Sequence, residues 1–280
     1  MLLSNKKNPK PNDLMNIQEL QNKDIDLLKE LQPETWTDIR PYFYYYSASD
    51  FCQPLKISED GRVIAVGTNI QHQDSAWLAH IIVHPEHRNR GLGRVMASAL
   101  IDGLDRERFK TIYLDATDMG YPVYKKLGFE IETEYIHLEG KHTDQYLLNP
   151  AAIIPFHADL KDELLALDRL ISAEDRVNVL EPHLRSSLVY VSEGKVQGAY
   201  FPSLLDGFVL AINDLAGTEL MKIRMRNKPT ARFPSGNQAC TDFLMENGYK
   251  ITGASKRMIL GEKREWNGKG IFHRISGGLG

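Results

Sequence analysis

Apolar residues recur along the chain in short runs whose spacing alternates between that of strands and that of helices. Residues 15–20 predict a first strand, and the helical spacing that follows begins at a cap formed by Asn22 or Asp24. Two further apolar runs flank the dipeptide Asp60-Gly61, a strong signal for a β-hairpin. The pattern therefore predicts that the chain opens as an antiparallel meander with a helix inserted into it.

The next apolar run leads into a loop rich in arginine and glycine. Residues 77–83 have the composition of a buried strand, and Pro85 ends it because proline has no N–H for a sheet ladder. The turn Arg88-Asn89-Arg90-Gly91-Leu92-Gly93 follows, and a helical pattern runs on through residue 104. A glycine-bearing turn at a helix N-terminus leaves backbone N–H groups free to bind an anion. The sequence predicts a pyrophosphate-binding loop here.

The rest of the first half continues with the same alternation. A buried strand is predicted at residues 111–116, a short helix at 118–127 and a last strand at 129–138. Gly128 follows the short helix at the position where a glycine commonly ends a helix.

The second half repeats this order in weaker form. We expect a helix, a hairpin, a strand and a helix, at residues 164–171, 188–200, 208–212 and 218–226. The strongest internal match pairs Val123–Phe129 with Phe243–Tyr249, each a short helical segment closed by glycine and an aromatic residue. The chain is therefore predicted to contain two related halves.

Composition and charge exclude several classes of protein. The 280 residues are 42% hydrophobic and 25% charged, and the net charge of −3 gives no electrostatic footprint for nucleic acid or an anionic membrane. Only two cysteines occur, Cys52 and Cys240, so we expect a reduced, cytoplasmic protein with no thiolate metal site. Residues 1–14 are expected to be a disordered lead-in, since they lack the apolar core of a signal peptide.

One aromatic run stands apart from this pattern. Residues 42–46 read Tyr-Phe-Tyr-Tyr-Tyr, a density that favours packing over a binding site because each ring buries a large area. The alternative is that the run forms one wall of an acceptor pocket.

The arginine and glycine loop gains meaning from two downstream segments. Leu114-Asp115-Ala116-Thr117 and Gly120–Phe129, together with the loop at residues 88–93, resemble the GNAT family of N-acetyltransferases. The rival interpretation, a dinucleotide-binding fingerprint, is weak because Met96 stands where a third glycine belongs. The resemblance covers residues 15–139 well, and the whole chain is similar to a subgroup that carries a second, degenerate domain.

This resemblance implies the fold and its division. We expect an α/β (α+β) protein of two tandem GNAT-like domains, each a mostly antiparallel mixed sheet flanked by helices. The catalytic domain would span residues 15–140, a linker residues 141–150, and a non-catalytic domain residues 151–280.

It also implies acetyl-coenzyme A as the donor and an amine as the acceptor, joined by direct attack in a ternary complex without a metal. The backbone of the loop would hold the pyrophosphate, and the preceding strand would pair with the pantetheine arm. A side chain in the turn after residue 116 would add one more cofactor contact. The cofactor-binding residues expected on this basis are Ile81, Val83, Arg88, Asn89, Arg90, Gly91, Leu92, Gly93, Arg94 and Thr117. Many family members have Asn in place of Thr117 and Ala in place of Gly120.

Tyr124 matches the position of the family's general acid. A phenol with a pKa of about 10 stays protonated at neutral pH and can give its proton to the departing thiolate. The N–H of Ile81 would polarise the thioester carbonyl. The general base is left open among His80, His84, Asp115 and bound water.

The second half is expected to do no acetyl transfer. The segment that corresponds to the phosphate loop begins Asn213-Asp214, and an acidic side chain there would repel a pyrophosphate. The whole chain is thus predicted to be an acetyltransferase with one site, acting on a small-molecule amine. The alternatives are a protein-lysine acetyltransferase and a non-catalytic acyl-coenzyme A binder or regulatory module.

Overall fold

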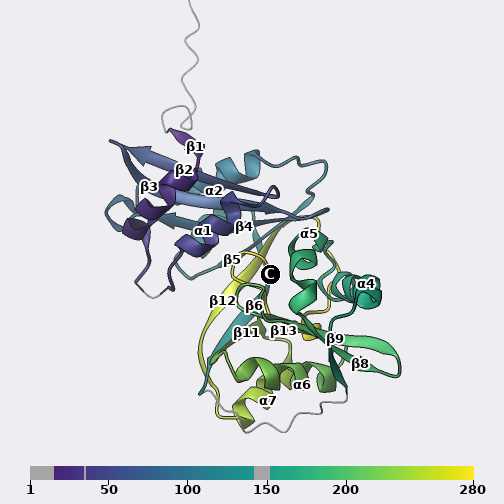
Figure 1. Cartoon of the computed structure of the whole chain (residues 1–280). Coiled ribbons are helices and arrows are strands. Elements are labelled where there is room, and N and C mark those ends of the chain that lie inside the picture. Colours follow the sequence, from purple (N-terminus) through teal and green to yellow (C-terminus); the bar gives the residue numbers. More distant parts are fainter. Residues whose placement is uncertain (1–15, 35, 142–151) are drawn as a thin grey trace, which may run out of the picture. The chain divides into compact units, whose positions relative to one another are not determined.

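A computed structural model describes residues 16–34, 36–141 and 152–280 of the chain (Figure 1). The fold is mixed α/β, with mostly antiparallel sheets flanked by helices, as the sequence predicts. The chain forms two compact units, each described here by itself. The expected lead-in at 1–14 and nearly all of the expected linker at 141–150 lie outside the described residues, so the predicted domain boundaries stay predictions.

Unit 1 comprises the described part of residues 1–70 together with residues 80–105. Its strands follow the order β1-β2-β3-β4, and β4 belongs to it only from His80 onward. The strands are β1 (Ile17–Glu19), β2 (Cys52–Glu59), β3 (Arg62–Gln71) and β4 (Ala76–Val83). The helices are the 3-10 helix η2 (Asn22–Leu31), α1 (Arg40–Ser47), the 3-10 turn η3 (Pro85–His87) and α2 (Leu92–Asp102).

Local sequence signals account for most of unit 1. Asp60 and Gly61 both adopt positive φ, 50° and 79°, which is the conformation that a tight two-residue hairpin turn between β2 and β3 requires. The predicted helix after residue 21 exists, but it is a 3-10 helix and its cap is Gln21, not Asn22 or Asp24. Asp24 is not the cap because it lies inside the first turn of the helix. From there its carboxylate accepts the Gln21 backbone N–H at 2.9 Å and pairs with Lys56 Nζ at 2.7 Å.

Unit 2 comprises residues 71–79 and the described part of 106–280, and it holds two sheets. In the first, the strand order is β4-β5-β12-β6-β11. The new strands of this sheet are β5 (Thr111–Ala116), β6 (Glu130–Glu139), β11 (Thr230–Pro234) and β12 (Lys250–Gly261). The second sheet has the order β13-β10-β9-β8-β7, with β7 (Ile153–Pro155), β8 (Leu188–Ser192), β9 (Lys195–Phe201), β10 (Phe208–Ala211) and β13 (Ile271–His273).

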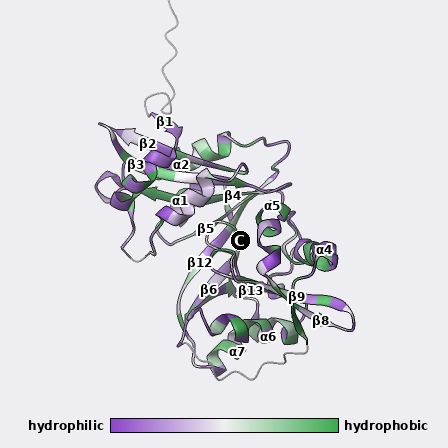
Figure 2. Ribbon diagram, in the orientation of Figure 1, coloured by the Kyte–Doolittle hydropathy of each residue, from purple (hydrophilic) through white to green (hydrophobic). Residues whose placement is uncertain are grey.

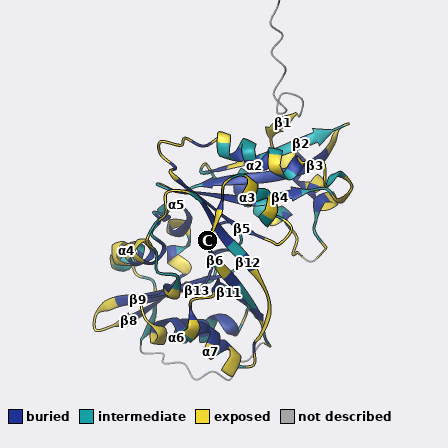
Figure 3. Ribbon diagram, turned by 180° about the vertical axis from the view of Figure 1, so that it is seen from behind, coloured by how far each residue is buried: buried dark blue, intermediate teal, exposed yellow. Residues whose placement is uncertain are grey.

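The helices of unit 2 cover both sheets. They are α3 (Tyr121–Lys126), α4 (Lys161–Ser172), α5 (Val177–Leu180), α6 (Asp214–Met225) and α7 (Gln238–Glu246), with 3-10 turns at η4 (Ala158–Leu160), η5 (Glu181–Ser186) and η6 (Gly268–Gly270). Figure 2 shows hydrophobic residues along α6 and α7, and these residues join β9, β10, β11 and β13 in one apolar core. The tip of the β8–β9 hairpin is exposed in Figure 3, as expected for a turn built on Glu193 and Gly194 with positive φ.

The feature of unit 2 that the sequence did not predict is the position of β12. This strand comes from the second half of the chain, yet it lies between β5 and β6 of the first half and pairs antiparallel with both. Its register runs from Lys256–Ala116 to Gly261–Thr111 along β5, and from Lys250–Glu139 to Ile259–Glu130 along β6. Because β12 satisfies the backbone groups of both neighbours, the two halves of the chain share one sheet.

The predicted internal repeat is visible as a repeated helix end. Gly128 and Gly248 both have positive φ, 92° and 80°, and each ends a helix that precedes a strand of the shared sheet. The Phe129 N–H donates to the Tyr124 carbonyl at 3.1 Å, and the Tyr249 N–H donates to the Leu244 carbonyl at 3.0 Å. The same hydrogen bond thus closes α3 and α7 at matching positions.

Candidate functional site

The arginine and glycine loop forms an open turn at the start of α2. Asn89 and Gly91 have left-handed φ values of 62° and 81°, and Gly91 is the N-cap of the helix. No side chain caps this helix, and no backbone acceptor in the described part of the chain binds the N–H groups of residues 89–94. Successive free N–H groups in such a turn form a concave site for an anion.

Space above the loop is also free. A Cβ atom added at Gly91 would meet nothing within 4 Å, and one added at Gly93 would meet only Val83 Cγ2 at 3.8 Å. The two glycines therefore leave room that, in the folded chain, no neighbouring side chain takes. The loop has the free donors and the space that a pyrophosphate needs.

The three arginines of the loop differ in what they bind. Arg88 Nε donates to the Val83 carbonyl at 3.3 Å, so it holds the end of β4 against the loop. Arg90 forms a two-pronged pair with Glu59, at 2.7 and 3.0 Å, and this pairing raises the pKa of Arg90 through its hydrogen bond. Arg94 is exposed. Among the three, Arg94 has the guanidinium most free to approach a phosphate.

Strand β4 changes its pairing midway. Its parallel ladder with β5 runs from Ala76–Ile112 to Leu78–Leu114, whereas β4 itself continues to Val83. The side chains of Ile81 and Val83 point toward α2, since Cβ atoms added at Gly67 and Gly93 would approach them at 3.1 and 3.8 Å. The side chain of His80 instead lies against the rings of Phe43 and Tyr46 in α1.

Tyr124 lies in α3 of unit 2 and is half-buried. Its ring packs edge-on against the buried Phe129, with centroids 6.1 Å apart. Burial raises the pKa of Tyr124 above the usual range of a phenol, so the hydroxyl stays protonated at neutral pH. No residue in the described ranges forms a hydrogen bond with this hydroxyl, so its proton is available to a ligand.

The turn before α3 shapes the surroundings of Tyr124. The Thr117 side chain accepts the Gly120 backbone N–H at 3.3 Å, so Thr117 helps to start the helix. A Cβ atom at Gly120 would lie 2.8 Å from Tyr124 Cε2, closer than van der Waals contact allows. Glycine at this position leaves room for the tyrosine ring.

The three side chains that the sequence offers as candidates for the general base have different surroundings in the structure. Asp115 Oδ2 is committed to a buried ion pair with Arg274, a residue near the C-terminal end that belongs to none of the sequence motifs. His84 Nδ1 accepts the backbone N–H of Glu86 at 3.3 Å in the turn after β4. His80 lies in unit 1 among the aromatic rings of α1, and burial lowers its pKa to about 4.

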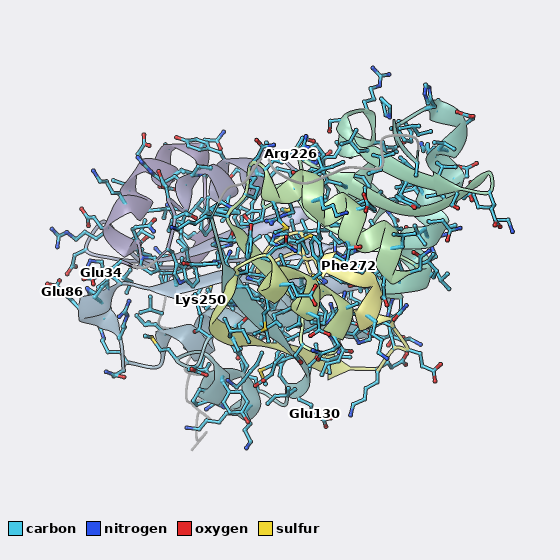
Figure 4. The ribbon with its side chains drawn as sticks, turned by 90° about the horizontal axis from the view of Figure 1, so that it is seen from below. Glu34, Glu86, Glu130, Arg226, Lys250 and Phe272 are labelled. Atoms are coloured by element: carbon cyan, nitrogen blue, oxygen red, sulfur yellow. The ribbon has the colours of Figure 1, made fainter. Side chains whose placement is uncertain are left out.

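A possible metal-binding group lies beside the loop, although the sequence predicts no metal. Within the described residues, ligand atoms of His84, Glu86 and His87 lie within 4.8 Å of one another, and Glu86 points outward in Figure 4. The guanidinium of Arg90 is 2.7 Å from His87 Nδ1, and a positive charge so close opposes a cation. We assign no metal role to this group.

The corresponding positions of the second half lack these features. The helix α6 begins at Asp214, four residues earlier than predicted, because the Asn213 side chain caps it by accepting the Ala216 N–H at 2.9 Å. A Cβ atom at Gly217 would lie 2.1 Å from the Phe272 ring, so the first turn of α6 is covered (Figure 4 labels Phe272). Leu244 stands where the first half has Tyr124 and offers no proton.

Comparisons with known proteins agree with the sequence motifs. The model described as "Acetyltransferase (GNAT) family" matches residues 17–129. The [ribosomal protein bS18]-alanine N-acetyltransferase of Salmonella typhimurium is 30% identical over 100 residues, which are 34% of this chain and 68% of that enzyme. The Escherichia coli (strain K12) enzyme of the same name is 28% identical over 82 residues, covering 28% of this chain and 55% of its own.

Solved structures with the same fold extend over both halves. A Pyrococcus horikoshii protein, provisionally described as an acetyltransferase, has a TM-score of 0.82 and 17% identity, and the match covers 99% of each chain. A tandem GNAT protein from the clavulanic acid biosynthesis pathway has a TM-score of 0.58 and 12% identity, over 90% of this chain and 99% of its own. At these identities the likeness concerns the fold, and it supports two GNAT-like domains. The protein is an acetyltransferase of the GNAT family.

Proposed function

We propose that this enzyme transfers the acetyl group of acetyl-coenzyme A to an amine by direct attack. The loop at residues 88–94 would bind the pyrophosphate, and the backbone of Ile81 and Val83 would pair with the pantetheine arm. The observation that carries the proposal is the open, uncapped N-terminus of α2, whose N–H groups and space suit an anion. Each charge-assisted hydrogen bond to such an anion contributes roughly 1.5–3 kcal/mol.

Tyr124 would act as the general acid. When the tetrahedral adduct collapses, the carbon–sulfur bond breaks and the thiolate takes the phenolic proton. The raised pKa and the uncommitted hydroxyl of Tyr124 support this role. Thr117 would contact the cofactor from the turn before α3.

The decisive experiment follows release of free thiol from acetyl-coenzyme A with a panel of amines. Tyr124→Phe keeps the ring and removes the proton donor, and we expect kcat to fall about 100-fold or more. Tyr121→Phe is the matched control, because Tyr121 is in the same helix and its ring contacts Lys125 and Lys256 rather than a proposed reactant. Equal rates for both variants would remove Tyr124 from the mechanism.

The acceptor is proposed to be a small-molecule amine. A second candidate is the terminal α-amino group of a protein, because the relatives named above act on an alanine of ribosomal protein bS18. Free amines and short peptides that begin with alanine, tested side by side, distinguish the two. Binding of acetyl-coenzyme A without turnover of any amine would instead favour a non-catalytic acyl-coenzyme A binder.

We further propose that the enzyme works in the cytoplasm. Cys52 and Cys240 are both free and buried, and burial raises the pKa of the Cys52 thiol to about 12, which makes it unreactive. No helix in the described ranges is long and apolar enough to cross a membrane.

A further inference from the structure

His80 is a half-buried polar residue to which the proposed function has so far given no role. It lies inside β4, yet its φ is 48°, a left-handed conformation that is uncommon for any residue with a side chain. Such an interruption in the middle of a strand turns the local backbone and re-aims the side chain. The strand is thus irregular at one residue, immediately before Ile81.

Four aromatic rings surround the imidazole. The centroid of the Tyr42 ring lies 4.7 Å away, and those of Tyr46, Phe43 and Trp36 lie 5.6 to 5.9 Å away. Phe43 and Tyr46 are fully buried, whereas Tyr42 is half-buried and Trp36 is 40% exposed. The rings of Phe43 and Tyr46 cover the imidazole from the core, while His80 itself is only half-buried and so keeps some exposure to solvent.

The two ring nitrogens of His80 have different surroundings. Nδ1 is 2.8 Å from the hydroxyl of the buried Tyr46, a contact that fixes the orientation of the imidazole. Nε2 has no hydrogen-bond partner among the residues that the structure describes. When Nδ1 carries the hydrogen and donates it to the Tyr46 oxygen, the Nε2 lone pair is free to accept a proton.

In the proposed function, His80 is the chain neighbour of the residue that would polarise the thioester carbonyl. The carbonyl of His80 and the N–H of Ile81 belong to one peptide bond, and that N–H is the group proposed to polarise the thioester. The Ile81 side chain points toward α2 and the phosphate loop, while the His80 side chain points toward α1. An acceptor amine that approaches from the α1 face would meet the imidazole with the thioester beyond it.

We propose that His80, oriented by Tyr46, is the general base that takes the proton of the attacking amine. This inference rests on the proposed acetyl transfer. The neutral amine forms a bond to the carbonyl carbon, the carbonyl π electrons move to oxygen, and the new ammonium gives one proton to His80 Nε2. The adduct then expels the thiolate, which takes its proton from Tyr124, and both residues are restored by exchange with solvent.

The protonation state of His80 is compatible with the role of a proton acceptor. Burial lowers the pKa of His80 to about 4, so its ring is neutral at pH 7 and its lone pair is not blocked by a proton. The nitrogen of the adduct is far more acidic than a free alkylammonium, because it is attached to a carbon that bears two other electronegative atoms. This acidity reduces the basicity that His80 needs in order to receive the proton.

The test removes the imidazole of His80 by mutation and then adds free imidazole to restore the rate. His80→Gln is expected to lower kcat about 100-fold, with the KM for acetyl-coenzyme A within about two-fold of the wild-type value. His80→Ala leaves a ring-sized space, and added imidazole should restore part of the rate, whereas pyrrole, of similar shape but without a basic nitrogen, should not. His157→Gln, at an exposed site, is the control expected to keep full activity.

A second variant tests the positioning role without removing the imidazole. Tyr46→Phe keeps the packing ring and deletes the hydroxyl, so we expect kcat to fall about ten-fold while the KM for acetyl-coenzyme A stays unchanged. Wild-type rates in His80→Gln, or equal rescue of His80→Ala by imidazole and pyrrole, would overturn the proposal. If the wild-type protein itself released no thiol with any amine, the proposed function would fail first, and the two outcomes are distinguishable.

Discussion

Glu174 offers the sharpest test of how unit 2 is held together. Its side chain is fully buried just after α4, and one oxygen, Oε2, accepts hydrogen bonds from Ser75 Oγ at 2.7 Å and Trp77 Nε1 at 2.8 Å. The other oxygen is 3.6 Å from Arg257, whose guanidinium also stacks on the Trp77 ring at 4.8 Å. Residues that precede and begin β4 are thus tied to the second half of the chain through one carboxylate.

The expected cost of removing this carboxylate follows from its partners. Glu174→Ala leaves Arg257 with a buried positive charge that has lost a neighbour and leaves two donors unpaired, which we expect to destabilise unit 2 by about 3–5 kcal/mol. Glu174→Gln keeps an acceptor of the same shape and loses only the charge, so its cost should be about 1–3 kcal/mol. Glu130→Ala, which breaks an exposed pair with Lys263, is the control expected to leave stability unchanged.

The sign of the pH dependence gives a second check. Burial acts to raise the pKa of Glu174, but Arg257, His72 and Arg176 outweigh it and hold the pKa below its ordinary value of 4.5. A carboxyl with a lowered folded-state pKa stabilises the fold above the unfolded pKa and loses that contribution as the pH falls. The difference between wild type and Glu174→Gln should therefore be largest above pH 4.5 and should shrink below it.

Urea denaturation followed by tryptophan fluorescence measures these differences, because Trp77 and Trp266 both lie against Arg257. Equal costs for the alanine and glutamine variants, or a cost below about 1 kcal/mol for alanine, would refute the argument that the carboxylate balances a buried charge.

Three further predictions concern the shared sheet and the proposed site. A fragment of residues 1–140 should not fold, because β5 and β6 would lose β12 from between them; a cooperative unfolding transition by circular dichroism would contradict this. Gly120→Ala should lower kcat without changing the KM for acetyl-coenzyme A, since the added Cβ would press on the Tyr124 ring at 2.8 Å, and unchanged kcat would show that the ring position is not critical. Gly93→Ala should keep the thermal stability of the wild type but weaken the binding of acetyl-coenzyme A measured by titration calorimetry. Gly91→Ala should weaken the same binding and, because its φ is 81°, should also lower the free energy of unfolding by about 1–2 kcal/mol.

The sequence alone determined the features that neighbouring residues encode. The hairpin at Asp60-Gly61, the glycine-bearing turn before α2 and the helix end at Gly128 all follow from glycine and its neighbours, whose backbone preferences act over a few residues. The repeat of that helix end at Gly248 was also visible, because its spacing is local. The family resemblance rests on the same short segments, so the amino-acid sequence was sufficient to indicate it.

Only the tertiary structure decided which distant segments meet. No local pattern states that β12 lies between β5 and β6, since strand pairing depends on the packing of faces that are far apart in sequence. The pairing of Asp115 with Arg274 and of Trp77 with Glu174 follows from that arrangement. The placement of His80 among the rings of α1 is another such outcome. The sequence shows the aromatic run at residues 42–46, but it does not show that this run packs around His80. The helix and the strand that carry these residues are distant in sequence and make contact only in the folded protein.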